Sequence, residues 1–174
     1  MNDSPSAQPL WRLRVWTRFF APPDQVWALK TDPQRLREEL SPLRLVVQDS
    51  QGLHEALASG REGSFQARLW PLGLSWPFQV SEIEPGRSFL DCSSNALFHR
   101  FEHRHLVEAT EEGSRYIDDL LLGPTSPAAA TKVDMLRRLF QRRHLRAARH
   151  LPHDDRATAV VVLREVLEHE LAPA

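Results

Sequence analysis

Residues 98–105 of the chain read FHRFEHRH, and no other stretch says more about how the protein is built. The alternation predicts a β-strand that places Phe101, His103, His105 and Val107 on one face. A buried neutral imidazole needs a hydrogen-bond partner for each ring nitrogen, so two of them do not suit a plain hydrophobic layer. We therefore expect this face to form the wall of a cavity.

The hairpin that follows this strand decides which carboxylate meets the histidines. A two-residue turn at 111–112 places His105 opposite Asp118, with the Cβ atoms about 5 Å apart. A three-residue loop would shift the register by one position and place His105 opposite Asp119. We favour Asp118, because the leucines two and four positions later continue the same inward-facing parity.

Three roles remain open for His103, His105 and Asp118. They could form a buried polar network that fixes the strand pair, a network that is rigid only when every member is satisfied. They could orient a ligand in an otherwise apolar pocket. They are also the candidates for catalytic acid–base chemistry, although no nucleophile or oxyanion hole is evident beside them. As a metal site the group lacks further nearby Cys or His, so we expect no metal and no cofactor.

The composition is that of one globular domain. The chain has 174 residues, with 22 basic and 23 acidic side chains, so it lacks the basic excess of a nucleic-acid-binding protein. Cys92 is the only cysteine, which excludes an internal disulfide and a cysteine-based zinc site in the monomer.

Residues 1–9 are polar and are expected to be disordered, without the apolar core of a signal peptide. No apolar run is long enough to span a membrane, and we expect a cytoplasmic protein without integral membrane association.

Hydrophobic periodicity and turn residues predict strands and helices in a definite order. A half-buried strand over 11–20 precedes two short helices, and a strand meander precedes a long helix that begins at 128 or 131 and ends at 151. The strands of the meander are expected over 43–48, more weakly 53–57, then 63–70, 74–83, 88–92, 97–109 and 115–122.

The last part of the chain, 152–174, is expected to add a separate segment to this domain of residues 10–151. A stripe of apolar residues over 154–171 favours a second helix. The β-branched run over 158–163 leaves a strand as the alternative. We regard this segment as a possible contact for a homodimer.

Several motifs in register resemble one bacterial branch of the START-like, or SRPBCC, superfamily. Trp76 is followed by a turn and by Phe89-x-Asp91. Residues 96–105 resemble the branch's Gly-Pro-Phe-x-x-Trp-x-His-x-His pattern, with Ala-Leu for Gly-Pro and Phe101 for Trp. Asp118 precedes Pro124, and residues 136–144 resemble the branch's long-helix signature. The resemblance covers about residues 11–151 and includes polyketide cyclase-like and epimerase-fused "cell division inhibitor" proteins.

The resemblance implies an α+β helix-grip fold, in which a curved antiparallel sheet wraps a long C-terminal helix and two short helices follow the first strand. It also implies an apolar cavity between the sheet and the long helix, which would bind a lipid-, polyketide- or quinone-like molecule. We expect the wall to be formed by Val15, Phe65, Trp76, Phe78, Phe101, His103, His105, Asp118, Leu136 and Phe140.

Two other functions compete with ligand binding. The first is an enzyme of cyclase or dehydratase type, in which a histidine is the general base and Asp118 fixes its tautomer. The second is an interaction or regulatory module whose cavity is filled by its own side chains. We favour binding without catalysis, because one fold hosts many activities and the sequence shows no complete catalytic constellation.

Overall fold

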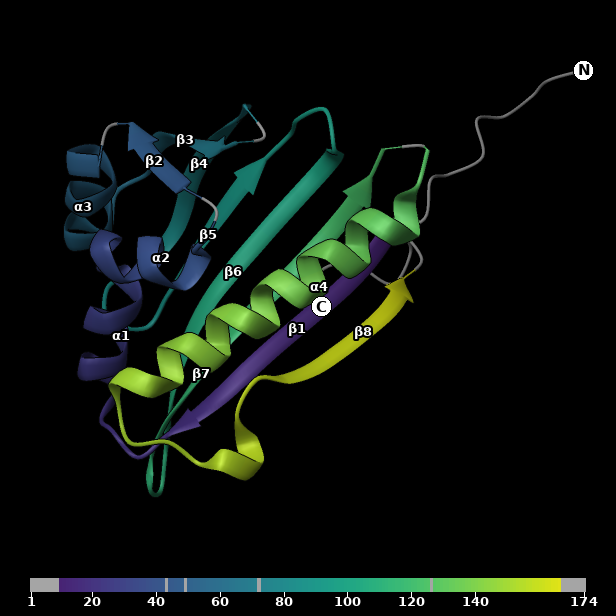
Figure 1. Ribbon diagram of the computed structural model, residues 1–174. Coiled ribbons are helices and arrows are strands. Elements are labelled where there is room, and N and C mark those ends of the chain that lie inside the picture. The colour runs from purple at the N-terminus through teal and green to yellow at the C-terminus, as the bar shows by residue number, and fades with distance from the viewer. Residues whose placement is uncertain (1–9, 43, 49, 72, 126, 167–174) are drawn as a thin grey trace, which may run out of the picture.

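The computed structural model describes residues 10–166, apart from 43, 49, 72 and 126. In this part of the chain an open antiparallel sheet lies against a long C-terminal helix, which confirms the predicted α+β class (Figure 1). The elements in chain order are β1 (Leu10–Phe19), α1 (Pro23–Thr31), α2 (Pro33–Leu40), β2 (Arg44–Gln48), α3 (Ser50–Ser59), β3 (Gly63–Trp70), β4 (Leu74–Glu84), β5 (Ser88–Ser93), β6 (Phe98–Thr110), β7 (Gly113–Pro124), α4 (Ala129–Ala147), the 3-10 turns η1 (Ala148–His150) and η2 (Asp155–Ala157), and β8 (Val160–Val166).

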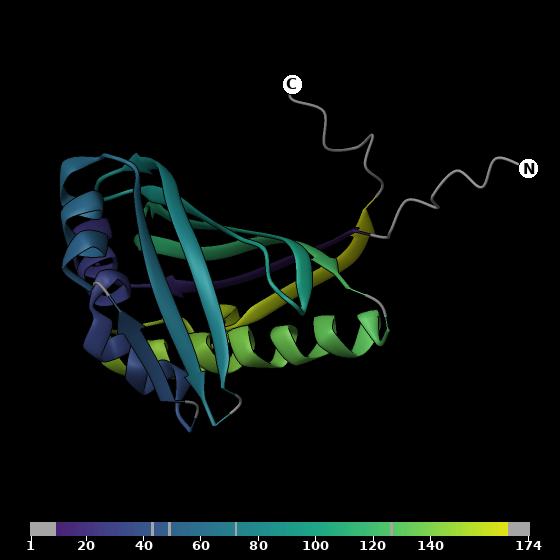
Figure 2. The same ribbon diagram turned by 90° about the horizontal axis from the view of Figure 1, so that it is seen from above.

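The sheet has eight strands in the order β2-β3-β4-β5-β6-β7-β1-β8. Helix α4 runs along one face of it (Figure 1), and the sheet curls around that side, with α1, α2 and α3 gathered at one end (Figure 2). The main core lies between α4 and the sheet, where Val133, Leu136 and Phe140 pack against Leu13 and Leu120. Burial of these side chains contributes about 25 cal/mol per Å² removed from water.

The two short helices after β1 follow from their first residues. Pro23 stands in the first turn of α1 and Pro33 in that of α2, where a missing N–H costs nothing. The Asp32 carboxylate accepts a hydrogen bond from the Gln34 backbone N–H at 2.8 Å and so caps α2. The chain therefore turns twice within a short distance, and α2 comes to lie against α4.

The β6–β7 hairpin has the predicted register. Thr110 pairs with Gly113, so the turn has two residues, and His105 lies opposite Asp118. Gly113 has φ +150°, and a Cβ there would lie 2.2 Å from the Phe19 carbonyl oxygen. The turn thus needs a glycine, because β1 passes directly over it.

Two sequence predictions are wrong. The weaker strand expected over 53–57 is part of helix α3. Leu53, Ala56 and Leu57 recur at helical spacing, and α3 uses this stripe to cover Val80 and Phe89 of the sheet. The short apolar run over 53–57 fits a strand as well as a helix. The contact of this segment with Val80 and Phe89 favours the helix.

The helix expected over 154–171 is also wrong where the structure describes it. Residues 155–157 form a 3-10 turn, and β8 pairs antiparallel with β1 from Leu10–Val166 to Trp16–Val160. The β-branched run therefore forms the alternative strand, because β1 offers it a free edge with unpaired N–H and C=O groups. Residues 1–9 and 167–174 lie outside the described residues. None of the helices described is long and apolar enough to cross a membrane.

Gly113→Ala should destabilise the fold by about 2–4 kcal/mol, because the added Cβ collides with backbone atoms of Phe19 and Ala21. Gly86→Ala is the matched control: Gly86 also has positive φ, +82°, but no atom lies within 4 Å of the added Cβ, so only about 1–2 kcal/mol of backbone strain is expected. Urea denaturation measures both. Equal losses in the two variants would contradict the close approach of β1.

Candidate functional site

A cavity of about 140 Å³ lies between the inner face of the sheet, α4 and the short helices. Strands β3 to β6 supply one wall and α4 the opposite wall, while α1, α2, β2 and α3 close the remaining side. The apolar lining includes Leu36, Leu40, Val47, Leu53, Leu57, Phe65, Ala67, Leu69, Trp76, Phe78, Phe89, Phe101, Leu136, Leu139 and Phe140.

Several inward-facing apolar side chains are not fully covered by the rest of the protein. Phe65 and Leu69 on β3, Phe78 on β4 and Leu139 on α4 are only half-buried although they line the cavity. Other lining residues on the same strands, such as Ala67 and Trp76, are buried. The sheet and α4 therefore diverge here, and the space between them is not filled by side chains.

Most of the predicted wall lies on this cavity. Eight of the ten predicted wall residues are in the lining: Phe65, Trp76, Phe78, Phe101, His103, His105, Leu136 and Phe140. Val15 and Asp118 are not: Val15 is fully buried in the core beside the cavity, and Asp118 is fully buried behind the histidines. The alternation that placed Val15 and Asp118 on the inner face was right, but the core on that face extends well beyond the cavity.

One end of the cavity is polar, and His105 lies at its centre. Its Nε2 is 2.8 Å from Asp91 Oδ2, and its Nδ1 is 2.8 Å from the Tyr116 hydroxyl. The adjacent ring of His103 lies against it, tilted by 40° with centroids 3.8 Å apart, and its Nδ1 is 3.4 Å from Asp91 Oδ2. The two imidazoles of the His-x-His motif thus share one carboxylate, which comes from β5.

Asp118 is the acceptor on which three other side chains converge. Its Oδ1 accepts hydrogen bonds from His103 Nε2 at 3.0 Å and from the Tyr116 hydroxyl, and its Oδ2 accepts one from His144 Nε2 at 3.2 Å. Burial alone would raise the pKa of Asp118, but the Arg143 charge and these donors hold it well below its usual range. Asp118 is therefore a buried carboxylate that stays ionised.

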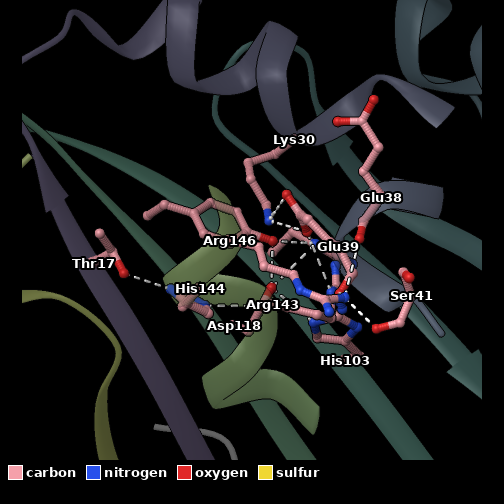
Figure 3. Close-up of polar contacts among 12 residues, drawn as sticks. Thr17, Lys30, Glu38, Glu39, Ser41, His103, Asp118, Arg143, His144 and Arg146 are labelled. Atoms are coloured by element: carbon pink, nitrogen blue, oxygen red, sulfur yellow. Dashed lines mark hydrogen bonds and ion pairs between the residues drawn. The ribbon is translucent and has the colours of Figure 1, made fainter. Parts of the chain in front are cut away.

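His144 extends this hydrogen-bond network to Thr17 on β1. Burial lowers the pKa of His144, so its neutral ring donates from Nε2 to Asp118 and accepts at Nδ1 from the Thr17 hydroxyl, 2.8 Å away. Thr17 Oγ1 in turn accepts the backbone N–H of Ala159 at 3.0 Å. Figure 3 shows this chain of contacts, which links β1, β7, α4 and the segment before β8.

A second buried ionic group joins α1, α2 and α4. Lys30 Nζ lies 2.7 and 2.9 Å from the two carboxylate oxygens of Glu39, and Arg143 Nε lies 3.5 Å from the same carboxylate. Lys30 also sits 4.6 Å above the Tyr116 ring. Arg146 donates to the carbonyl oxygens of Glu38, Glu39 and Ser41, which fixes the end of α2 on α4 (Figure 3).

The two adjacent imidazoles differ in charge. Burial opposes a proton on His103, but the carboxylates of Asp91 and Asp118 outweigh it and raise the pKa of His103 to about 9. Burial, together with the charge on His103, lowers the pKa of His105 to about 4. Near neutral pH one ring is therefore an imidazolium and the other is neutral, since both cannot be charged at this separation.

Several residues of this site were not predicted from the sequence. Asp91 belongs to the Phe89-x-Asp91 motif, and Arg143 and His144 belong to the long-helix signature, but none of the three was among the expected site residues. Tyr116 could have been predicted from the sequence, because it lies two positions before Asp118 on the same strand face. The Lys30–Glu39 pair could not, because it depends on how α1 and α2 pack.

Comparisons with known proteins place the chain among domains of this architecture. The model of the family described as Domain of unknown function (DUF8410) matches residues 17–151. Protein CV1439 from Chromobacterium violaceum is similar, with a TM-score of 0.57 and 16% identity, over 82% of this chain and 98% of that chain. A nucleoside-diphosphate sugar epimerase from Corynebacterium glutamicum has a TM-score of 0.56 and 19% identity, over 78% of this chain and 28% of that chain.

DynU16, a protein in the dynemicin biosynthetic locus, has a TM-score of 0.56 and 21% identity, over 80% of this chain and 46% of that chain. At these identities the similarities show a shared fold only. No curated protein matches the sequence.

Asp118→Asn should destabilise the protein by about 3–5 kcal/mol, because it removes the buried negative charge that balances nearby Arg143 and replaces one of the two acceptor oxygens with a donor. Asp119→Asn, one position along β7, is the matched control. Asp119 pairs on the other face of the sheet with Arg12 and Arg14, which are 41% and 44% exposed, so its loss should cost about 1 kcal/mol or less. Similar losses of unfolding free energy in the two variants would show that the buried Asp118 network stabilises the fold no more than the ion pairs of Asp119.

The stability difference between the wild type and Asp118→Asn should depend on pH. The pKa of Asp118 is lowered in the folded state, so its ionised form stabilises the fold above the unfolded pKa of about 3.9, and this stabilisation is lost as the pH falls further. The difference should therefore be constant from pH 7 to pH 5 and shrink below about pH 4. A gap that widens on acidification would contradict the assignment.

Proposed function

We propose that this chain, which belongs to the family described as Domain of unknown function (DUF8410), binds a hydrophobic small molecule in the cavity between its sheet and α4. We also propose that it is a START-like, or SRPBCC, protein. The order of its elements, the curved sheet around α4 and the similarity to an epimerase chain and to DynU16 support that assignment.

The observation that carries the proposal is the combination of an apolar wall with a polar end. Half-buried side chains such as Phe65, Phe78 and Leu139 stay partly uncovered, and covering them with a ligand would be favourable by about 25 cal/mol per Å². His103, His105 and Arg143 lie at one end of the same cavity. Pockets of this kind obtain affinity from the apolar wall and orientation from the polar groups.

The other two functions receive less support. A cyclase or dehydratase would use a histidine as base with Asp118 fixing its tautomer. His103 makes that contact at 3.0 Å, but the neighbouring carboxylates raise its pKa to about 9, so near neutral pH it already carries the proton that a base must accept. A filled, vestigial cavity agrees poorly with about 140 Å³ of free space. Homodimer formation through residues 152–174 stays a prediction, although β8 already uses one of its edges to pair with β1.

A bound molecule should be recovered from the protein itself. Native mass spectrometry of the purified full chain is expected to show an added mass, and denaturing extraction should release an apolar compound whose class names the ligand. If the protein is free of ligand and also fails to bind Nile red, a general apolar dye, then the binding proposal is wrong.

Leu139→Trp should lower the affinity for Nile red by about tenfold or more, because the larger ring occupies the cavity. Leu145→Trp on the same helix is the control: Leu145 is 49% exposed and lies outside the cavity lining, so this variant should bind the dye like the wild type. Fluorescence titration measures both affinities. Unchanged binding in Leu139→Trp would mean that the dye binds elsewhere.

A further inference from the structure

We propose that Asp91, His103 and His105 form a binding site for one divalent transition-metal ion, with Zn²⁺ or Fe²⁺ as the ions that suit its ligands best. We call these three residues the β5–β6 triad. From the sequence, His-x-His with Asp118 lacked further nearby Cys or His, and no metal was expected. The tertiary structure supplies a different carboxylate, from the neighbouring strand, and this changes the conclusion. The proposal goes beyond ligand binding and does not depend on it.

The strand pairing gives the triad its geometry. Asp91 on β5 lies directly opposite His103 on β6, and His105 lies two positions further on the same face. Asp91 Oδ2 is 2.8 Å from His105 Nε2 and 3.4 Å from His103 Nδ1, and the candidate ligand atoms all lie within 4.8 Å of one another. Ligands bonded to zinc at about 2.0–2.1 Å are about 2.9–3.4 Å apart, so little movement is needed to enclose an ion.

The outer nitrogens of both rings are already held by other groups. The Tyr116 hydroxyl donates its hydrogen to Asp118, so its oxygen accepts a hydrogen bond from His105 Nδ1. His103 Nε2 donates to Asp118 at 3.0 Å. In the neutral rings the inner nitrogens therefore carry lone pairs that face Asp91. Metal-binding histidines typically have this arrangement, in which the second nitrogen is tied to a carboxylate or another acceptor.

Asp91 itself has an oxygen without a partner. Its side chain is only 6% exposed, yet Oδ1 makes no hydrogen bond to any described residue. Its other oxygen, Oδ2, is 2.8 Å from a nitrogen that carries a lone pair when His105 is neutral. Both features are costly without a cation, because a buried carboxylate needs partners. An ion between the three side chains would satisfy both oxygens.

The charges around the triad also favour a cation. The buried carboxylates here are Glu39, Asp91 and Asp118, whereas the permanently charged buried cations are Lys30 and Arg143. Lys30 and Arg143 both contact Glu39. When both triad histidines are neutral, one negative charge is left over at the end of the cavity where the triad lies.

The donor set selects the class of ion. Two imidazoles and one carboxylate suit Zn²⁺ and Fe²⁺, whereas Mg²⁺ and Ca²⁺ prefer oxygen ligands throughout. Three protein ligands leave coordination positions open, and all three residues line the cavity, so the open positions face it. A ligand in the cavity with an oxygen or nitrogen donor could then bind the ion directly.

The test is a titration of the metal-stripped full chain, prepared without a histidine tag, with Co²⁺ followed by visible absorption. We expect the d–d bands of a bound ion, saturation at one ion per chain, and displacement by Zn²⁺ but not by Mg²⁺. Asp91→Asn and His105→Gln should each weaken Co²⁺ binding by about 100-fold or more, because each removes a ligand. His99→Gln, which changes an exposed histidine of the same strand, should bind like the wild type.

Tyr116→Phe separates a positioning effect from the loss of a ligand. It removes the acceptor of the His105 Nδ1–H and one donor to Asp118 but no ligand of the triad, so Co²⁺ affinity should fall by about 10-fold while the bands keep their shape. X-ray absorption of the Zn²⁺-loaded wild type needs no variant and should show nitrogen and oxygen ligands with two imidazoles and no sulfur. Failure of the wild type to bind Co²⁺ or Zn²⁺, or binding unchanged in both ligand variants, would overturn the proposal. Nile red binding is measured separately, so failure of the metal site and failure of the ligand site can be told apart.

Discussion

The buried carboxylate of Asp118 is the constraint on which the rest of the structure depends. Three donors converge on it, from β6, β7 and α4, and through His144 it also reaches Thr17 on β1. An ionised group with no exposed surface is costly unless every lone pair is used, so each of these elements can occupy only one position relative to the others. The network thus fixes α4 against the sheet at one end and determines where the cavity begins.

The cavity follows from the same arrangement. Toward one end, α4 is held close to the sheet by Phe140, Leu136 and the polar network. Arg146 and the buried Glu39 group tie α2 to α4, so that α2 closes one side of the cavity. Apolar side chains line the opening and stay partly uncovered. The protein therefore combines a rigid, polar end with an apolar space, an arrangement that suits recognition of a molecule with one polar group.

The register of the central hairpin was predictable because strand alternation and turn length are local properties. His105 lies opposite Asp118 as expected, and the inward face of β6 carries the predicted residues. The hydrogen-bond partners were not predictable. Asp118 bonds to His103, while His105 turns to Asp91 and Tyr116. Side-chain direction and the lateral order of strands decide these contacts, and neither can be read from a single strand.

The sequence by itself determined the order of most elements and the inward face of the central strands, because hydrophobic period and turn residues act over a few positions. The fold class followed from the motifs that resemble START-like proteins. Only the tertiary structure decided that 50–59 forms a helix and 160–166 a strand, since both runs fit either structure until they meet a neighbour. It also decided that Asp91 meets both histidines. That meeting depends on the pairing of β5 with β6, a long-range contact that no local pattern specifies.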